Sequence, residues 1–280
     1  MIDTLPWNCP TCHSEVATPY CPECGERALG TQELTLRGLF DQVFLALTSI
    51  DGRLIRTFRA LVSRPGQLTA AYLQGQRQPY IGPVSLFLIA NVLFFAVESL
   101  TGGTVFTTPL DSHLHSQPWS AVAESLVSNR LQTLQTTLDI YAPEFDRAVA
   151  RNARSFIILM ALSFALLPQI MFPRSRWPFV GHAVFALHLY AFMLLLFCIA
   201  TTVLAVNLVG GAGVGPENLD AGISLSLLVA CAAYLHISAG AVYGGSAPNR
   251  AFKAVVLTVG VAMIVLGYRF TLLLVTLYST

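Results

Sequence analysis

Charged residues are scarce in this sequence. Asp, Glu, Lys and Arg account for 11% of the 280 residues and hydrophobic residues for 54%, whereas a soluble protein carries about 25% charged residues. So little charge cannot supply a soluble surface, which argues against an ordinary cytosolic enzyme. Because the chain is so apolar, intrinsic disorder is excluded as well. The composition favours a protein whose solvent is largely lipid.

Lysine is nearly absent, since Lys253 is the single Lys beside fifteen Arg. We attribute this preference to genomic base composition rather than to function. The formal net charge of +1 gives no basis for nucleic-acid binding, and we expect no nucleic-acid partner.

Several functional signatures are missing. The first ten residues, MIDTLPWNCP, carry neither the basic nor the apolar region of a signal peptide, so we expect the N-terminus to stay in the cytoplasm. The sequence also lacks a phosphate-binding glycine loop, a Ser or Cys nucleophile motif and an H-E-x-x-H helix. It therefore displays no recognisable reaction.

Long apolar runs are abundant, and a helix needs about 20 apolar residues to cross a bilayer. The first run begins at Pro83, a residue that is favourable at the start of a helix. The runs predict an all-α polytopic membrane protein with about five transmembrane helices. The predicted spans are residues 83–101, 155–172, 180–209, 221–243 and 254–279.

The basic residues predict how this bundle is oriented, because cytoplasmic segments of membrane proteins are enriched in Lys and Arg. If the five spans cross in turn, eleven of the sixteen basic residues share a side with the N-terminus, and four Arg lie in the long segment 102–154. We therefore expect the N-terminus inside and the C-terminus outside.

Residues 102–154 form a polar insertion that we expect outside the cytoplasm. Its apolar residues recur at helical spacing and predict one amphipathic helix that Pro143 interrupts. The apolar stripe can be a partner-binding face, but more often such a stripe packs on its own domain. The stripe consists of Ala123, Val127, Leu131, Leu134, Leu138 and Tyr141. Beyond Pro143, the chain is expected to run helically into the second span, where Pro168 predicts a kink.

Two C-P-x-C motifs within residues 1–30 give the strongest chemical signal. Cys9 and Cys12 form the first pair, and Cys21 and Cys24 the second, with eight residues between the pairs. Two such turns can complete a tetrahedral shell of four sulfurs, which leaves no open position for catalysis. The pattern predicts structural Zn²⁺, and so adds a small N-terminal zinc ribbon to the all-α membrane protein. A rubredoxin-like iron site is the alternative, and two disulfides would require an oxidising compartment.

Residues 31–82 are predicted to form cytoplasmic amphipathic helices. An apolar face runs from Leu34 to Leu47, and a second segment, 53–64, places four Arg among aliphatic and aromatic residues. This pattern is typical of helices that lie in the membrane interface and reach lipid phosphates. The alternative is a helix packed on the cytoplasmic face of the bundle, and the two can coexist. The residues proposed to bind a headgroup or a partner are Arg56, Arg64, Arg77 and Tyr80.

The same region resembles a bacterial membrane family, the domain of unknown function 3667. The matching residues are Arg56-Thr57, Arg64-Pro65-Gly66 and Tyr72-Leu73-x-Gly75-x-Arg77-x-x-Tyr80-x-x-Pro83. The segment from Gly181 to His188 is similar to the family's E-H-x-V-F-x-L-H, with Gly181 in the Glu position, and Val242-Tyr243-Gly244 and Lys253 also fit. The resemblance implies a four-cysteine ribbon followed by several spans, in the bacterial cytoplasmic (inner) membrane, and no settled activity.

Ionisable residues inside the spans are costly and therefore functional candidates. His182 lies at the start of its span, while His188 and His236 are predicted at matching depths of roughly 10–12 Å from the cytoplasmic ends of theirs. These histidines can serve as catalytic bases, metal or haem ligands or proton relays, or simply as interhelical hydrogen-bond partners. Glu98 and Arg269 are predicted to pair near the outer interface.

Two functions follow from these observations. The first is a non-catalytic inner-membrane protein whose zinc ribbon and Arg-rich interfacial helices recruit a cytoplasmic protein partner or an anionic phospholipid. The second is a membrane-embedded enzyme or transporter with the three histidines around a cavity that opens to the cytoplasm. The second requires the histidines to line one polar pocket, whereas the first does not.

Overall fold

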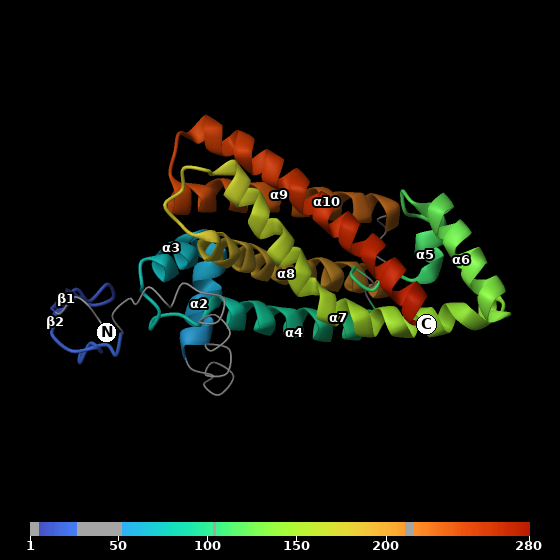
Figure 1. Cartoon of the computed structure of the whole chain (residues 1–280), viewed down its shortest axis with the longest axis horizontal. Helices are drawn as coiled ribbons and strands as arrows, with labels where there is room; N and C mark the ends of the chain where they lie inside the picture. Colours follow the sequence, from blue (N-terminus) through green and yellow to red (C-terminus); the bar gives the residue numbers. More distant parts are fainter. Residues whose placement is uncertain (1–5, 27–51, 103–104, 211–215) are drawn as a thin grey trace.

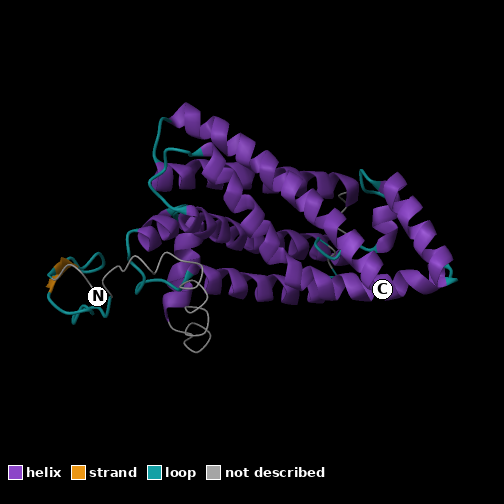
Figure 2. Cartoon of the chain, in the orientation of Figure 1, coloured by secondary structure: helices purple, strands orange, loops and turns teal. Residues whose placement is uncertain are grey.

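The computed structural model describes residues 6–26, 52–102, 105–210 and 216–280 (Figure 1). A two-stranded antiparallel ribbon comes first, with β1 (Trp7–Asn8) paired to β2 (Glu15–Val16). All other regular elements in this described part are helices (Figure 2). The predicted amphipathic face from Leu34 to Leu47 lies outside the described residues.

The helices vary greatly in length, from six residues to 34. The short ones, α2, α3, α5 and α6, lie at the two ends of the long ones (Figure 1). In chain order they are α2 (Gly52–Ser63), α3 (Gln67–Leu73), α4 (Pro83–Thr101), α5 (Leu110–His115), α6 (Ser120–Leu134), α7 (Leu138–Met171), α8 (Phe179–Gly210), α9 (Pro216–Tyr243) and α10 (Ala247–Ser279).

Four helices are long and apolar enough to cross a membrane. They are α4, α8, α9 from Gly222, and α10, and the bent helix α7 is a fifth candidate. Their exposed side chains include many aliphatic residues, such as Ile199, Val229 and Val259. A helix that is apolar on every side is expected where lipid replaces water as the solvent. The structure therefore confirms a mostly helical chain with four or five candidate membrane-spanning helices.

The long helices run along the longest axis of the molecule and separate two ends (Figure 1). The ribbon, α2, α3, the α7–α8 turn and the α9–α10 turn lie at one end, which we call the ribbon end. Helices α5 and α6 and the C-terminus lie at the opposite end. The two ends are thus separated by the span candidates.

Helix α8 holds the bundle together at the ribbon end. Every residue from Val180 to Leu194 is buried, and α8 packs against α4, α7 and α9. Farther along, its side chains become accessible, for example Val206 at 65%. The first half of α8 is therefore the centre of the protein core, and its second half is partly exposed.

Helix α7 has a sharp bend that the sequence did not predict. Its two halves, Leu138–Ala153 and Phe156–Met171, meet at an angle of 53°, so this bend does not lie at Pro168. The Tyr268 hydroxyl donates a hydrogen bond to the Ala153 carbonyl oxygen at 2.9 Å. A side chain that bonds a backbone carbonyl at the break replaces part of the helical ladder, which is a recognised cause of kinks.

The insertion also differs from the single interrupted helix that the sequence predicts. The break lies at Gln135, which has a left-handed backbone with φ of 51°, while Pro143 is inside α7. Pro143 sits near the N-terminus of that helix, where few carbonyls lose a partner. Ala123 and Val127 are buried, so the first part of the stripe packs on its own protein, whereas Leu134 and Leu138 are exposed.

The turn between α2 and α3 fits tightly against α9. Gly66 has φ of +83°, and a Cβ atom there would lie 2.6 Å from the Ser238 Cα and 2.8 Å from the Ser238 carbonyl oxygen. Both the backbone conformation and the contact exclude a side chain. The R-P-G motif therefore serves to seat α2 and α3 on the membrane helices.

We predict that Gly66→Ala lowers the free energy of unfolding by more than the cost of a left-handed alanine alone. A left-handed non-glycine residue costs about 1–3 kcal/mol, and the contact with Ser238 adds to that. Gly102→Ala isolates the conformational cost, because Gly102 has φ of +68° with nothing within 4 Å. Thermal unfolding in detergent should rank Gly66→Ala below Gly102→Ala. Equal midpoints would contradict the packing argument.

Candidate metal centre

The ribbon brings its two cysteine pairs together as two similar turns. In the first turn, the His13 N–H donates to the Cys9 carbonyl at 2.9 Å, and in the second, the Gly25 N–H donates to the Cys21 carbonyl at 2.9 Å. Both turns end in a left-handed residue, with φ of 62° at His13 and 73° at Gly25. His13 therefore occupies in the first turn the position that glycine fills in the second.

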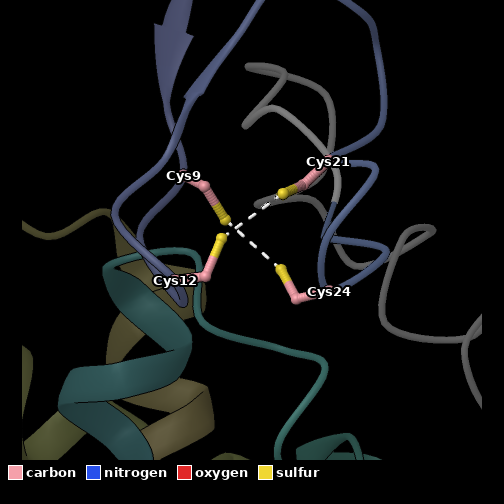
Figure 3. Close-up of side chains that lie close together, drawn as sticks. All are labelled: Cys9, Cys12, Cys21 and Cys24. Atoms are coloured by element: carbon pink, nitrogen blue, oxygen red, sulfur yellow. Dashed lines mark hydrogen bonds between the residues drawn. The ribbon is translucent and has the colours of Figure 1, made fainter.

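The four sulfurs have the spacing of a tetrahedral metal site. All four Sγ atoms lie within 4.8 Å of one another, with 3.4 Å between Cys9 and Cys24 and between Cys12 and Cys21. A tetrahedron with Zn–S bonds of about 2.3 Å has sulfurs about 3.8 Å apart. Figure 3 shows the four side chains converging on a common point. All six cysteines are free thiols, so no disulfide competes for these sulfurs.

The surroundings of the thiols favour ionisation at two of them. The Ser14 hydroxyl lies 2.9 Å from Cys12 Sγ and 3.4 Å from Cys21 Sγ. It lowers the pKa of both thiols, that of Cys21 to about 6. Burial instead raises the pKa of Cys24 to about 12. Because metal ligands must be thiolates, binding here should release protons and weaken as the pH falls.

Glu26, directly after the second turn, docks the ribbon onto the rest of the protein. Its side chain is 2% exposed. Oε2 accepts hydrogen bonds from the backbone N–H groups of Arg77 at 3.0 Å and Gln78 at 3.1 Å, and from the Thr11 hydroxyl at 2.7 Å. A buried carboxylate requires such partners. These bonds fix the position of the ribbon on the loop after α3.

The loop after α3 in turn contacts both cysteine turns. Gln76 Nε2 donates to the Pro10 carbonyl in the first turn at 2.7 Å, and Gln78 Nε2 donates to the Gly25 carbonyl in the second at 3.0 Å. We call this loop, residues 74–82, the docking loop. It can make both hydrogen bonds only when the two cysteine turns keep their observed positions relative to each other. A metal ion bound by both turns would fix those positions.

The four residues predicted to bind a headgroup or a partner differ in their exposure to solvent. Arg56 and Arg64 are exposed on and just after α2. Arg77 is half-buried below the ribbon, with its guanidinium 5.0 Å from the Tyr72 ring centroid. Tyr80 packs against the membrane core. The two exposed arginines are thus available at the surface, while Arg77 and Tyr80 belong to the packed loop between α3 and α4.

The three candidate histidines have separate surroundings. His182 Nδ1 is 2.8 Å from the Tyr243 hydroxyl, which joins α8 to α9. His188 Nδ1 is 2.8 Å from the Thr69 hydroxyl, which joins α8 to α3. His236 is half-buried on α9. Among the described residues, the four ribbon cysteines form the one group of three or more potential metal ligands, so the histidines receive no support as a shared metal site.

Glu98 and Arg269 reach the same short segment at the opposite end of the molecule. The Phe106 N–H lies 3.4 Å from Glu98 Oε1, and Arg269 donates to the Val105 carbonyl at 3.0 Å. The aromatic ring of Phe106 packs edge-on against Phe94 and Phe197. Both charged residues therefore contact Val105 and Phe106, and their direct pairing remains a prediction.

The sequence gives no signal for the roles of Glu26 and Thr69. Neither an acidic residue two positions after the last cysteine nor a threonine in a short helix belongs to a recognisable motif. The partners of both lie far along the chain, at Arg77, Gln78 and His188. Only the tertiary fold brings these groups together.

A family model described as "Protein of unknown function (DUF3667)" matches residues 51–95. The match confirms the resemblance of the segment that carries R-P-G and Y-L-x-G-x-R. It spans α2, α3, the docking loop and the first part of α4. No curated protein and no solved structure gives a significant match to the chain.

We predict that Glu26→Ala releases the ribbon from its docking loop. A hydrogen bond to a charged group contributes about 1.5–3 kcal/mol, so hydrogen exchange at the Arg77 and Gln78 amides should accelerate by about tenfold or more. Glu23→Ala is the matched control, because Glu23 is an exposed acid of the same ribbon. If exchange at these amides is the same in both variants, Glu26 does not hold the ribbon in place.

Proposed function

We propose that this chain is a non-catalytic protein of the bacterial inner membrane whose zinc ribbon and α2 form a lipid-binding platform on the cytoplasmic side. The ribbon holds Zn²⁺ through Cys9, Cys12, Cys21 and Cys24. Helix α2 lies in the membrane interface and binds anionic phospholipid. The observation that carries the proposal is the docking of both cysteine turns onto the loop that precedes the first span candidate.

The metal has a structural role in this proposal. Four thiolates fill a tetrahedral zinc shell and leave no site for a substrate. A metal that joins two turns stabilises the fold of a small ribbon that has little core of its own. The buried core of this ribbon consists only of Cys9, Val16 and Cys21. So small a core supports a structural role for the metal.

Helix α2 supports the lipid-binding role through its two faces. Thr57, Ala60 and Leu61 are buried against the protein. The opposite face exposes aliphatic and basic side chains at helical spacing, and α2 runs across the direction of the long helices (Figure 1). An interfacial helix needs this combination of apolar residues and arginines that reach phosphates. The exposed face consists of Ile55, Arg56, Arg59 and Val62.

The proposed orientation follows from the placement of charge. The ribbon end carries the arginines of α2 together with Arg174, Arg176, Arg250 and Lys253. Cytoplasmic segments are the ones enriched in basic residues. We therefore place the ribbon end in the cytoplasm. An enzyme or transporter built around the histidines is the less favoured alternative, because His182 and His188 each have an interhelical partner.

We predict that the purified protein contains one zinc ion per chain. Elemental analysis should find zinc rather than iron, and Cys21→Ser should lose most of it. Cys231→Ser is the control, since Cys231 is buried in α9 away from the ribbon. Bound iron would replace the zinc assignment by the rubredoxin-like alternative. Full metal content in Cys21→Ser would contradict the four-sulfur site.

We also predict that the exposed face of α2 contacts the bilayer. A spin label on Ile55→Cys, in a protein with Cys198 and Cys231 replaced by Ser, should be more accessible to oxygen than to a polar nickel complex. The same label on Glu23→Cys, in the ribbon, should show the reverse. Replacing phosphatidylglycerol by phosphatidylcholine, or introducing Arg56→Glu with Arg59→Glu, should weaken the contact.

An Ile55 label that behaves like the Glu23 label would contradict lipid binding by α2. The exposed apolar face would then fit a cytoplasmic protein partner better than a bilayer.

A further inference from the structure

A second feature of the ribbon end lies away from α2 and the ribbon. A cavity of about 630 Å³ opens between the C-terminal end of α7, the turn that follows it and the turn between α9 and α10. Its lining includes two cations, Arg174 and Lys253, together with Asn249 and Tyr243. None of the residues described around it is acidic. The cavity therefore has the charge to receive an anion.

Lys253 lines this cavity and is held in place by two contacts. Its Nζ donates a hydrogen bond to the Met171 carbonyl at the end of α7, at 2.7 Å, and lies 4.1 Å from the centroid of the Phe172 ring. An ammonium group has three donors, and Met171 takes one of them. The lysine is thus fixed in place while it retains donors for a ligand.

An aromatic stack forms the wall behind Lys253. The Phe172 and Tyr243 rings stack with centroids 4.1 Å apart, and the His182 ring stacks on Tyr243 at 5.5 Å. The hydrogen bond between His182 and Tyr243 ties this wall to the buried half of α8. His182 is therefore a positioning residue, because it orients Tyr243, which lines the cavity.

An apolar groove continues from the cationic cavity along the membrane helices. It has a volume of about 250 Å³ and lies between α7 and α10. The cavity and the groove share Ile170 and Met171, so they adjoin. Ile170 and Val259 are 71% and 58% exposed on the outer surface of the helices. Because α7 and α10 are span candidates, this groove faces the hydrocarbon of the bilayer.

We propose that the cavity and the groove together bind one anionic phospholipid. Its phosphate lies between Arg174 and Lys253, and one acyl chain follows the groove along Ile170, Val256 and Val259. A free phosphate would use only the cationic half of the site. A zwitterionic lipid would bring a third positive group beside two cations, which is unfavourable. Cationic pockets between membrane helices on the cytoplasmic side are suited to anionic headgroups.

This site is independent of the proposed lipid contact of α2, since it uses α7 and α10. The spin-label experiment on α2 and the binding experiment on this site can therefore fail separately.

The test is a titration of the full-length protein in detergent with dioleoyl phosphatidylglycerol, followed by native mass spectrometry. Arg174→Ala should weaken binding about fivefold, the equivalent of about 1 kcal/mol per basic residue near a membrane surface. Arg176→Ala is the matched control, because Arg176 lies in the same turn but stacks on Trp177 at 4.4 Å and does not line the cavity. It should leave binding unchanged.

Val259→Trp tests the apolar half, because the larger side chain would fill the groove and should weaken phosphatidylglycerol binding. Neither this variant nor Arg174→Ala removes the Lys253–Met171 hydrogen bond, so both should fold. Equal binding of dioleoyl phosphatidylcholine would overturn the proposal. So would equal losses in Arg174→Ala and Arg176→Ala. Displacement of the lipid by millimolar inorganic phosphate, together with wild-type binding by Val259→Trp, would indicate a free-phosphate site instead.

Discussion

The position of the ribbon depends on one buried carboxylate. Glu26 accepts two backbone N–H groups from the loop after α3 and a hydroxyl from the first cysteine turn. Desolvating a carboxylate is costly unless such donors are in place. Burial of Glu26 therefore requires the ribbon to be docked on the loop. Gln76 and Gln78 add one hydrogen bond to each cysteine turn. A metal ion shared by the two turns would thereby influence a loop that leads directly into α4.

Several residues of the segment matched by the family model make packing contacts. Gly66 lets the α2–α3 turn approach α9, Thr69 bonds His188 on α8, and Tyr72 is buried beside Arg77. Gly66 and Thr69 thus connect the ribbon end to the long helices, and Tyr72 packs beside the loop after α3. The same segment also has exposed basic groups, Arg56, Arg59 and Arg64, which are available for lipid or partner binding.

The sequence was sufficient for features that depend on local pattern. Four close cysteines and several long apolar helices follow directly from motif spacing and run length. It was insufficient where distant residues decide the outcome. The bend in α7 coincides with a hydrogen bond from Tyr268 rather than with Pro168, and His188 bonds Thr69 of a short helix. The predicted break at Pro143 was wrong. The left-handed residue Gln135 ends α6, and Pro143 lies inside the next helix, near its N-terminus.

Metal binding in the ribbon should be coupled to the stability of the docking loop. The most direct measurement is hydrogen exchange of the wild-type protein in detergent before and after a chelator removes the metal. Coupling predicts that the amides of Arg77 and Gln78 lose protection when the metal leaves, while amides in the buried half of α8 do not. Full retention of protection at Arg77 and Gln78 in the metal-free protein would contradict the account.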